Sequence, residues 1–419
     1  MNIWSISLQN IKSKPLYTLL SILMLALSIS LLLGIQQLKT SFKYQMENNL
    51  GAIDLVLGAK GSPLQLVLSS ILHLDNPTGN ISYSEAIKMK KNPMVDKAVP
   101  ISYGDNYKGY RIVGTTGEFM SFYNAEIQEG RTVEKSLEAV IGHAVAEQLQ
   151  LKTGATFLSS HGLIANDIDV HDEEFTVVGI LKPTQKVIDR LIVTHLESIW
   201  DVHNHEDHEH EEEEHEHKPG EHKHEEEEHK HEHEHEDEKE ITSLLISFKN
   251  PMGLLTIPRK INEETNMQAA LPKFELNRLY EFTGVGFTTI TWIAYLILII
   301  SGMTIFISLY KMVKERAFDL ALLRTYGASN VQLIKMVTYE GLIIVGTAFV
   351  IGYLLTKAGL FFMFNLMDTN NQYTILQALP FHELLQIIGL VFVMITLSVT
   401  FAIYPIIKMN VSTILSNEK

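Results

Sequence analysis

Four stretches of the chain are apolar over a length that can cross a lipid bilayer. They are Leu16–Ile35, Phe287–Tyr310, Val337–Leu355 and Leu384–Ile407, and the charged residue among them is Glu340. A helix of about 20 apolar residues spans the hydrocarbon core. Apolar runs of this length are rare in soluble proteins, so four buried helices of a soluble core are the less favoured interpretation. The first stretch exceeds the apolar part of a signal peptide and lacks a small-x-small cleavage site at its end, which predicts a retained membrane helix.

Basic residues predict the orientation of these helices. Cytoplasmic loops of membrane proteins carry an excess of Lys and Arg, and here those residues lie before the first helix, between the second and third, and after the fourth. We therefore expect both termini in the cytoplasm of a bacterial plasma membrane protein and a large segment outside. The residues are Lys12, Lys14, Lys311, Lys314, Arg316, Arg324, Lys335 and Lys408.

The expected organisation follows from these two patterns. It comprises a cytoplasmic or interfacial segment (1–15), the first membrane helix (16–35), an extracytoplasmic domain (36–286), the second helix (287–310), a cytoplasmic loop (311–336), the third helix (337–355), an outer loop (356–383), the fourth helix (384–407) and a cytoplasmic tail (408–419). In the first segment, Ile3, Trp4, Leu8 and Ile11 share one face of a helix. Such a helix either lies at the membrane interface or simply extends the first membrane helix.

The segment between the first and second helices has the pattern of an α+β domain. Alternating or β-branched runs, several of them separated by glycine-containing turns, predict strands at Tyr110–Val113, Ala139–Ile141, Phe175–Leu181, Leu191–Val193 and Leu244–Phe248. Helical patterns fit Ser84–Lys91 and Gly142–Leu149. The predicted fold class is therefore an α-helical membrane protein with four transmembrane helices and an α+β extracytoplasmic domain inserted between helices 1 and 2.

One hydrophilic block accounts for the acidity of the chain. The formal net charge is −15 over 419 residues, but residues 201–240 contain 20 acidic residues, four Lys and 12 of the 18 His, a net charge of −16. The other 379 residues hold 30 basic and 29 acidic residues. No basic domain exists that would bind nucleic acid. The absence of Cys excludes disulfides, thiolate zinc sites and Fe–S clusters.

The same block predicts metal binding. It repeats His-x-His pairs separated by four Glu with a 14-residue period, and two such imidazoles chelate a borderline cation such as Zn²⁺, Ni²⁺ or Cu²⁺. Composition predicts a disordered insert without a preformed cage. A solvated loop without a metal and a pH sensor remain alternatives. The candidate ligands are His203, His205, His208, His210, His215, His217, His222, His224, His229, His231, His233 and His235.

Weaker metal candidates lie elsewhere in the same domain. His73 and Asp75 form an H-x-D pair in a turn-rich stretch, where a turn or capping network is favoured over a metal site. His161 and His171 lie close to several Asp residues, where an exposed loop is the favoured interpretation. No arrangement of a hydrolase is present, and no cofactor is expected to be tightly bound.

The cytoplasmic loop carries a specific resemblance. Residues 314–329 read KERAFDLALLRTYGAS, in which Phe318, Leu322 and Thr325–Tyr326 line one face of a short helix and Gly327 ends it. The loop resembles that of the MacB/FtsX-type ABC transporter permeases, which include the lipoprotein-releasing LolC/LolE permeases. Glu129-Gly130-Arg131, Lys152-Thr153-Gly154 and Val177–Leu181 are similar to the periplasmic core of that family.

The resemblance implies a non-catalytic membrane subunit that works as a homodimer or heterodimer with a separate ABC ATPase. The sequence contains no G-x-x-x-x-G-K-[ST] loop, so ATP chemistry is expected in the partner chain. Membrane lipid and an extracytoplasmic binding or adaptor protein are further expected partners. The residues that the resemblance places at the ATPase contact are Glu315, Arg316, Phe318, Asp319, Leu320, Leu323, Arg324, Gly327 and Ala328.

Three functions remain open at this stage. The His-rich block favours transport linked to a metal ion, with zinc as the first candidate. The family resemblance equally allows export or release of a lipid, lipoprotein or peptide. A third possibility is a regulator, similar to FtsX, that activates a cell-wall hydrolase without transporting a substrate.

Overall fold

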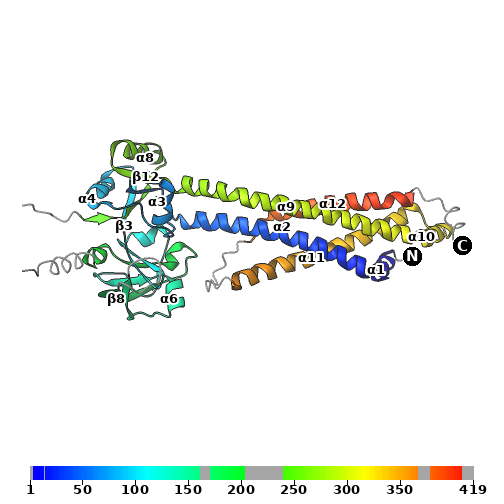
Figure 1. Cartoon of the computed structure of the whole chain (residues 1–419), viewed down its shortest axis with the longest axis horizontal. Coiled ribbons are helices and arrows are strands. Elements are labelled where there is room, and N and C mark those ends of the chain that lie inside the picture. The colour runs from blue at the N-terminus through cyan, green and yellow to red at the C-terminus, as the bar shows by residue number, and fades with distance from the viewer. Residues whose placement is uncertain (1–2, 14, 161–169, 203–238, 367–377, 408–419) are drawn as a thin grey trace, which may run out of the picture. The chain divides into compact units, whose positions relative to one another are not determined.

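A computed structural model describes residues 3–13, 15–160, 170–202, 239–366 and 378–407. The chain divides into two compact units (Figure 1). Met1–Lys43 and Phe282–Lys419 form the helical unit, and Tyr44–Glu281 forms the sheet unit. The predicted histidine ligands 203–235 and His161 lie outside the described residues.

The helical unit contains the four predicted membrane helices. Four of its helices are long and apolar enough to cross a membrane, and each contains one of the predicted spans. The helices are α1 (Ile3–Ser13), α2 (Pro15–Asn49), α9 (Pro272–Glu315), α10 (Ala317–Thr325), α11 (Asn330–Leu366) and α12 (Phe381–Ile407). Pro15 is the first residue of α2, a position where its missing N–H and fixed φ are tolerated, and α1 ends at Ser13 as a separate helix.

Small and hydroxylated residues lie where the long helices of this unit touch. The hydroxyls of Ser28 in α2 and Ser301 in α9 lie 2.6 Å apart and share a hydrogen bond. Gly352 of α11 lies so close to α2 that a Cβ there would be 2.8 Å from the carbonyl oxygen of Ala26. Membrane helices associate through such close backbone approach and interhelical hydrogen bonds, because lipid offers no hydrophobic driving force.

The sheet unit is built on a mixed sheet of ten described strands, with helices packed against it (Figure 1). The strands of the unit are β1 (Leu55–Ala59), β2 (Ile81–Ser82), β3 (Val95–Tyr107), β4 (Tyr110–Thr115), β5 (Ile127–Gly130), β6 (Glu138–Ile141), β7 (Thr156–Ser160), β8 (Val170–Leu181), β9 (Ile192–His195), β10 (Glu240–Ile241), β11 (Ser243–Phe248) and β12 (Met267–Ala270). Of these, β2 and β10 pair with each other in a separate two-stranded sheet. Its helices include α3 (Pro63–Ser70), α4 (Tyr83–Ala86), η1 (Ile87–Lys91), α5 (Phe119–Phe122), α6 (His143–Leu149), η2 (Val187–Arg190) and α8 (Met252–Glu264).

The strand order is β12-β1-β11-β3-β4-β9-β6-β8-β5, and β7 pairs with β3 and β8. Pairs β4–β9 and β6–β8 are parallel, while the other described pairs are antiparallel. Hydrophobic clusters form along this sheet, among them one around β1 and β11 with α8 and another around β6, β8 and β9 with α6. Further fully buried side chains, such as Phe119 and Tyr123, belong to neither of these clusters.

The predicted fold class is confirmed: an α+β domain is inserted between the first and second of four long apolar helices. All five predicted strands are present, as β4, β6, β8, β9 and β11. The prediction missed β1 and β3, among other elements. Strand β3 contains Pro100 and Gly104, residues that argue against a strand when only the local sequence is considered.

The close approach of α2 and α11 gives a testable prediction. We expect Gly352→Ala to lower the stability of the full chain by roughly 1–3 kcal/mol, because the added methyl must push the helices apart. Gly346→Ala in the same helix meets no atom within 4 Å and should stabilise slightly, since Ala is the better helix former. Thermal unfolding of both variants in one detergent checks this, and equal effects would contradict it.

Candidate coupling site

Helix α10 begins after Arg316 and is ended by backbone hydrogen bonds around Gly327. Arg316 is its N-cap residue, and Gly327 follows its end with φ +94°. The N–H of Gly327 donates to the carbonyl of Arg324 (3.1 Å), and that of Ala328 donates to the carbonyl of Leu323 (3.0 Å). A left-handed glycine with such bonds satisfies the last carbonyls of a helix. The chain therefore turns sharply from α10 toward α11.

Helix α11 begins with a reciprocal cap that completes this turn. The N–H of Gln332 donates to Oγ of Ser329 (3.3 Å), and the N–H of Ser329 donates to Oε1 of Gln332 (2.9 Å). This capping box satisfies two amides at the start of the helix. Its effect is to set the direction in which α11 leaves α10.

One face of α10 is buried and the other is exposed. Leu320 and Ala321 are buried, and Leu320 belongs to the core of the helical unit. The face that the sequence predicted to be apolar is a different one from the buried face of Leu320 and Ala321. On that predicted face, Phe318 and Leu322 are half-buried and Tyr326 is 81% exposed. The helix is thus anchored on one side, and the aromatic residue that follows it, Tyr326, is exposed.

The remaining predicted residues fall into two groups. Glu315 is the last residue of α9 and lies 3.9 Å from Lys311 in an exposed pair, while Asp319 is exposed in the first turn of α10. Leu323 and Ala328 are partly buried against the core of the helical unit. These positions give residues 315–328 a charged outer surface over an apolar base.

Arg316 connects three helices through a buried carboxylate. Its guanidinium Nη1 lies 3.6 Å from Oε1 of Glu340 in α11, which is 1% exposed. Asn10 of α1 donates from Nδ2 to the same carboxylate oxygen (2.6 Å). Arg316 also donates from Nη2 to the backbone carbonyl of Asn10 (3.1 Å). The start of α10 is thereby tied to both α1 and α11.

Sequence reasoning missed Glu340 and Asn10 as parts of this site. A signal existed for Glu340, because an ionisable residue inside a membrane span is rare and has a partner. Removing one partner of a buried pair costs about 3–5 kcal/mol, since the other charge stays buried and uncompensated. Nothing in the local sequence distinguished Asn10 from other polar residues.

Helix α1 packs against α11 beside this network. Ser7 is buried and donates from Oγ to the carbonyl of Met336 (3.2 Å), and the rings of Trp4 and Tyr339 meet edge to face at 5.6 Å. Trp4 and Leu8 remain exposed, on the face that the sequence suggested for the membrane interface. The α1 helix therefore combines a protein-facing side with an apolar outer side.

In the sheet unit, His73 and Asp75 have different partners. His73 is buried with φ +53°, and its Nδ1 lies 2.9 Å from the hydroxyl of Tyr103. Asp75 accepts the N–H of Asn76 (2.8 Å) through Oδ1, a turn contact. No three His, Cys, Asp or Glu side chains gather as a metal site among the described residues. His171 lies in β8.

The His73 ring is enclosed by groups that disfavour its protonation. The guanidinium of Arg111 stacks 4.3 Å above the Tyr103 ring, and Nε2 of His73 has no hydrogen-bond partner among the described residues. Burial, with a smaller contribution from the positive charge of Arg111, lowers the pKa of His73 to about 3. The folded sheet unit therefore holds a neutral imidazole.

This burial makes the stability of the sheet unit depend on pH. The unfolded chain takes up the proton near pH 6.5, so stability present above that pH falls progressively until about pH 3. We expect His73 to account for a loss of roughly 2 kcal/mol between pH 7 and pH 5. Denaturant unfolding of the full chain, followed through Trp200, should show a flatter pH dependence in His73→Gln. The more exposed His195→Gln serves as the control, and an unchanged slope in His73→Gln would refute the assignment.

The two ends of the His-rich block are held together. Residues 196–202 are helical and precede the block, and β10 follows it. The indole Nε1 of Trp200 donates to the carbonyl of Glu240 (2.8 Å), and Lys239 Nζ lies 4.7 Å from the centre of the Trp200 ring. Tyr83 meets the same ring edge to face at 5.5 Å. The block is thus an insertion whose two ends meet beside the rings of Trp200 and Tyr83.

Comparison with protein families matches two regions of the chain. The MacB-like periplasmic core domain matches residues 18–214, and the FtsX-like permease C-terminal domain matches residues 291–411. Together these regions make up most of the chain. The chain belongs to the MacB/FtsX-type ABC permeases. This MacB/FtsX-type permease is a multi-pass membrane protein, and its sheet unit is an extracytoplasmic domain.

Solved structures similar to the permease include three domains. They are the periplasmic region of MacB from Actinobacillus actinomycetemcomitans (8% identity, TM-score 0.33, 56% of this chain and 97% of that chain), the extracellular domain of the noncanonic ABC-type transporter YknZ from Gram-positive bacteria (11%, 0.30, 51% and 98%), and a domain of a permease protein from Porphyromonas gingivalis (11%, 0.26, 53% and 88%). Comparison with curated proteins gives no match. The family assignment rests on the two matching family models.

Proposed function

We propose that this permease couples ATP hydrolysis by a separate ATPase subunit to movement of its extracytoplasmic domain. The observation that carries the proposal is α10, a short helix anchored by Leu320 and Ala321 that exposes Tyr326. Amphipathic helices of this kind fit into grooves of partner proteins. The sequence itself contains no phosphate-binding loop, which agrees with an ATPase on another chain.

The network at Arg316 gives this coupling a physical path. Movement of α10 acts on Arg316, which is bonded to α1 through Asn10 and paired with Glu340 of α11. Arg316 also follows directly on Glu315, the last residue of α9. The division between the two units falls inside α2 and inside α9. These two helices are therefore the elements proposed to carry motion to the sheet unit.

A surface substitution tests the docking role of α10. We expect Tyr326→Ala to reduce ATPase stimulation by about tenfold or more, because exposed aromatic residues at such contacts are often dominant. Tyr353→Ala, which removes a 44% exposed tyrosine from α11, is the matched control. The measurement is ATP hydrolysis by the complex purified from the native membrane, with and without each substitution.

A backbone disruption provides the second arm of this test. Leu320→Pro breaks α10 at its anchor, since proline in a helix interior costs about 3 kcal/mol or more. The four long helices remain to hold the chain in the membrane. ATPase stimulation should be lost in this variant, and normal stimulation in both Leu320→Pro and Tyr326→Ala would overturn the coupling proposal.

The finer function that we propose is transport linked to a metal cation, with zinc first. The support is chemical: the 12 His in residues 201–240 are arranged in His-x-His pairs among carboxylates, which suit borderline divalent metals. The ends of the block are held by the Trp200–Glu240 hydrogen bond. A dimer with a second permease chain and an extracytoplasmic binding protein complete the proposed assembly.

Removing the block tests its role while sparing the domain. We expect deletion of residues 203–238, which keeps Trp200 and Glu240, to abolish most Zn²⁺ binding by the purified chain without lowering its unfolding temperature. Longer loops cost little to close, about 0.6 kcal/mol per doubling. A full-length variant with all 12 His replaced by Asn separates chemistry from length. Unchanged Zn²⁺ binding in both variants, or unchanged cellular zinc under limitation, would argue against a metal-linked function.

A further inference from the structure

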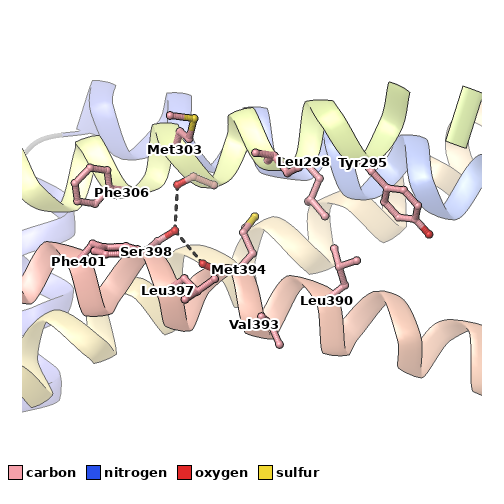
Figure 2. A pocket seen from close by; sticks show the side chains of 12 residues that line it. Tyr295, Leu298, Met303, Phe306, Leu390, Val393, Met394, Leu397, Ser398 and Phe401 are labelled. Atoms are coloured by element: carbon pink, nitrogen blue, oxygen red, sulfur yellow. Dashed lines mark hydrogen bonds between the residues drawn. The ribbon is translucent and has the colours of Figure 1, made fainter. Parts of the chain in front are cut away.

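An apolar cavity of about 480 Å³ lies between α9 and α12 within the helical unit (Figure 2). Leu298 and Phe306 of α9 face Met394 and Phe401 of α12 across it. The rings of Phe306 and Phe401 meet edge to face, with centroids 6.2 Å apart, and close one end of the cavity. The cavity is open on one side, where Ile299, Met303 and Val393 of its lining are 59–62% exposed.

Two hydroxyl side chains line this cavity: Tyr295 lies at one end, and Ser398 in the buried part is already hydrogen-bonded. Ser398, the single hydroxyl among its buried lining residues, lies 3.1 Å from the carbonyl oxygen of Gly302 and 3.0 Å from that of Met394 (Figure 2). A Cβ on Gly302 would lie 2.7 Å from Met394, so glycine is needed for this approach. An apolar cavity without polar partners does not hold ordered water, and hydrocarbon is the chemistry that fits it.

A smaller polar cavity of about 90 Å³ adjoins the apolar one. The hydroxyl of Thr40 donates to Oε2 of Glu383 (3.2 Å), and no described residue pairs with Oε1 of that carboxylate. No Lys or Arg is among the described residues that line this cavity. It is lined by Gln36, Thr291, Glu383 and Gln386, and it shares Tyr295 and Leu390 with the apolar cavity.

The two cavities follow one another along the helices. From Thr291 to Phe306, α9 passes from the polar cavity to the closed end of the apolar one, a length of about 22 Å at 1.5 Å per residue. The polar end belongs to the part of α9 that follows the extracytoplasmic domain in the chain. A lipid of the outer leaflet also has its polar headgroup on the extracytoplasmic side and its apolar chains farther into the membrane. The order of the two cavities therefore matches the order of headgroup and chain.

We propose that this pair of cavities binds a lipid whose headgroup carries a primary ammonium. The chain of the lipid lies between α9 and α12, and the ammonium lies at Glu383. Its three N–H groups match the carboxylate together with the amide oxygens of Gln36 and Gln386. An anionic headgroup without an amine finds no cation in the described lining of the polar cavity.

The test compares lipids that differ only in the headgroup. The full chain is incorporated into bilayer discs that contain phosphatidylethanolamine and phosphatidylglycerol with identical acyl chains, and the retained lipid is counted by native mass spectrometry after extraction. Retention of phosphatidylethanolamine should exceed that of phosphatidylglycerol. We expect Glu383→Gln to lower it by about tenfold, the effect of losing one charge-assisted hydrogen bond. Glu315→Gln, an exposed carboxylate at the other end of α9, should leave it unchanged.

Two further variants test the chain-binding cavity. Val393→Trp fills the apolar cavity and should reduce retention of both lipids, whereas Phe392→Trp, at a similarly exposed neighbour outside the lining, should not. Equal retention of the two lipids by the wild type, or no effect of Val393→Trp, overturns the proposal. Because the chain has no cysteine, Val393→Cys also reports on its surroundings. Quantitative disulfide dimers through that position would show that a second copy covers the cavity and would likewise overturn it.

Discussion

A single buried carboxylate constrains the helical unit at the point where α10 joins it. Glu340 is 1% exposed, and a charge in such a site is costly unless it is paired and hydrogen-bonded. Arg316 and Asn10 meet that requirement from two other helices. The start of α10 therefore has little freedom of its own. A force applied to α10 must either move α1 and α11 with it or break a buried ion pair.

Contacts between the long helices follow a different rule. Where two helices touch, the residues are small or hydroxylated, such as Ser28 with Ser301. Beside the contact of Gly302 with Met394, large apolar side chains of α9 and α12 line a cavity instead. Both arrangements suit a lipid bilayer, which gives helices no hydrophobic driving force to associate. Close backbone contact holds the helices together there, and hydrocarbon fills a gap between them.

In the sheet unit, the residues that form the hydrophobic clusters and the residues that carry most of the charge lie in different parts of the sequence. Hydrophobic clusters around β1 and β11 and around β6, β8 and β9 pack on the mixed sheet, while the block of charge −16, which exceeds the net charge of the whole chain, is inserted beside Trp200. Such an insertion adds chain between two ends that are already close, so it disturbs neither cluster. The acidic character of the protein is therefore a property of this insertion. The rest of the domain is stabilised by its buried side chains, among which His73 is neutral.

Much of this architecture was readable from the sequence alone, because it depends on local patterns. Hydropathy over about 20 residues identified the four spans, and a glycine after a short helical pattern predicted the end of α10 at Gly327. Tertiary structure alone decided which distant residues meet. The Asn10–Glu340 contact joins positions 330 residues apart, and the apolar cavity exists only because α9 and α12 lie side by side. Local periodicity carries no information on such pairings, since they are set by which buried surfaces and charges satisfy one another.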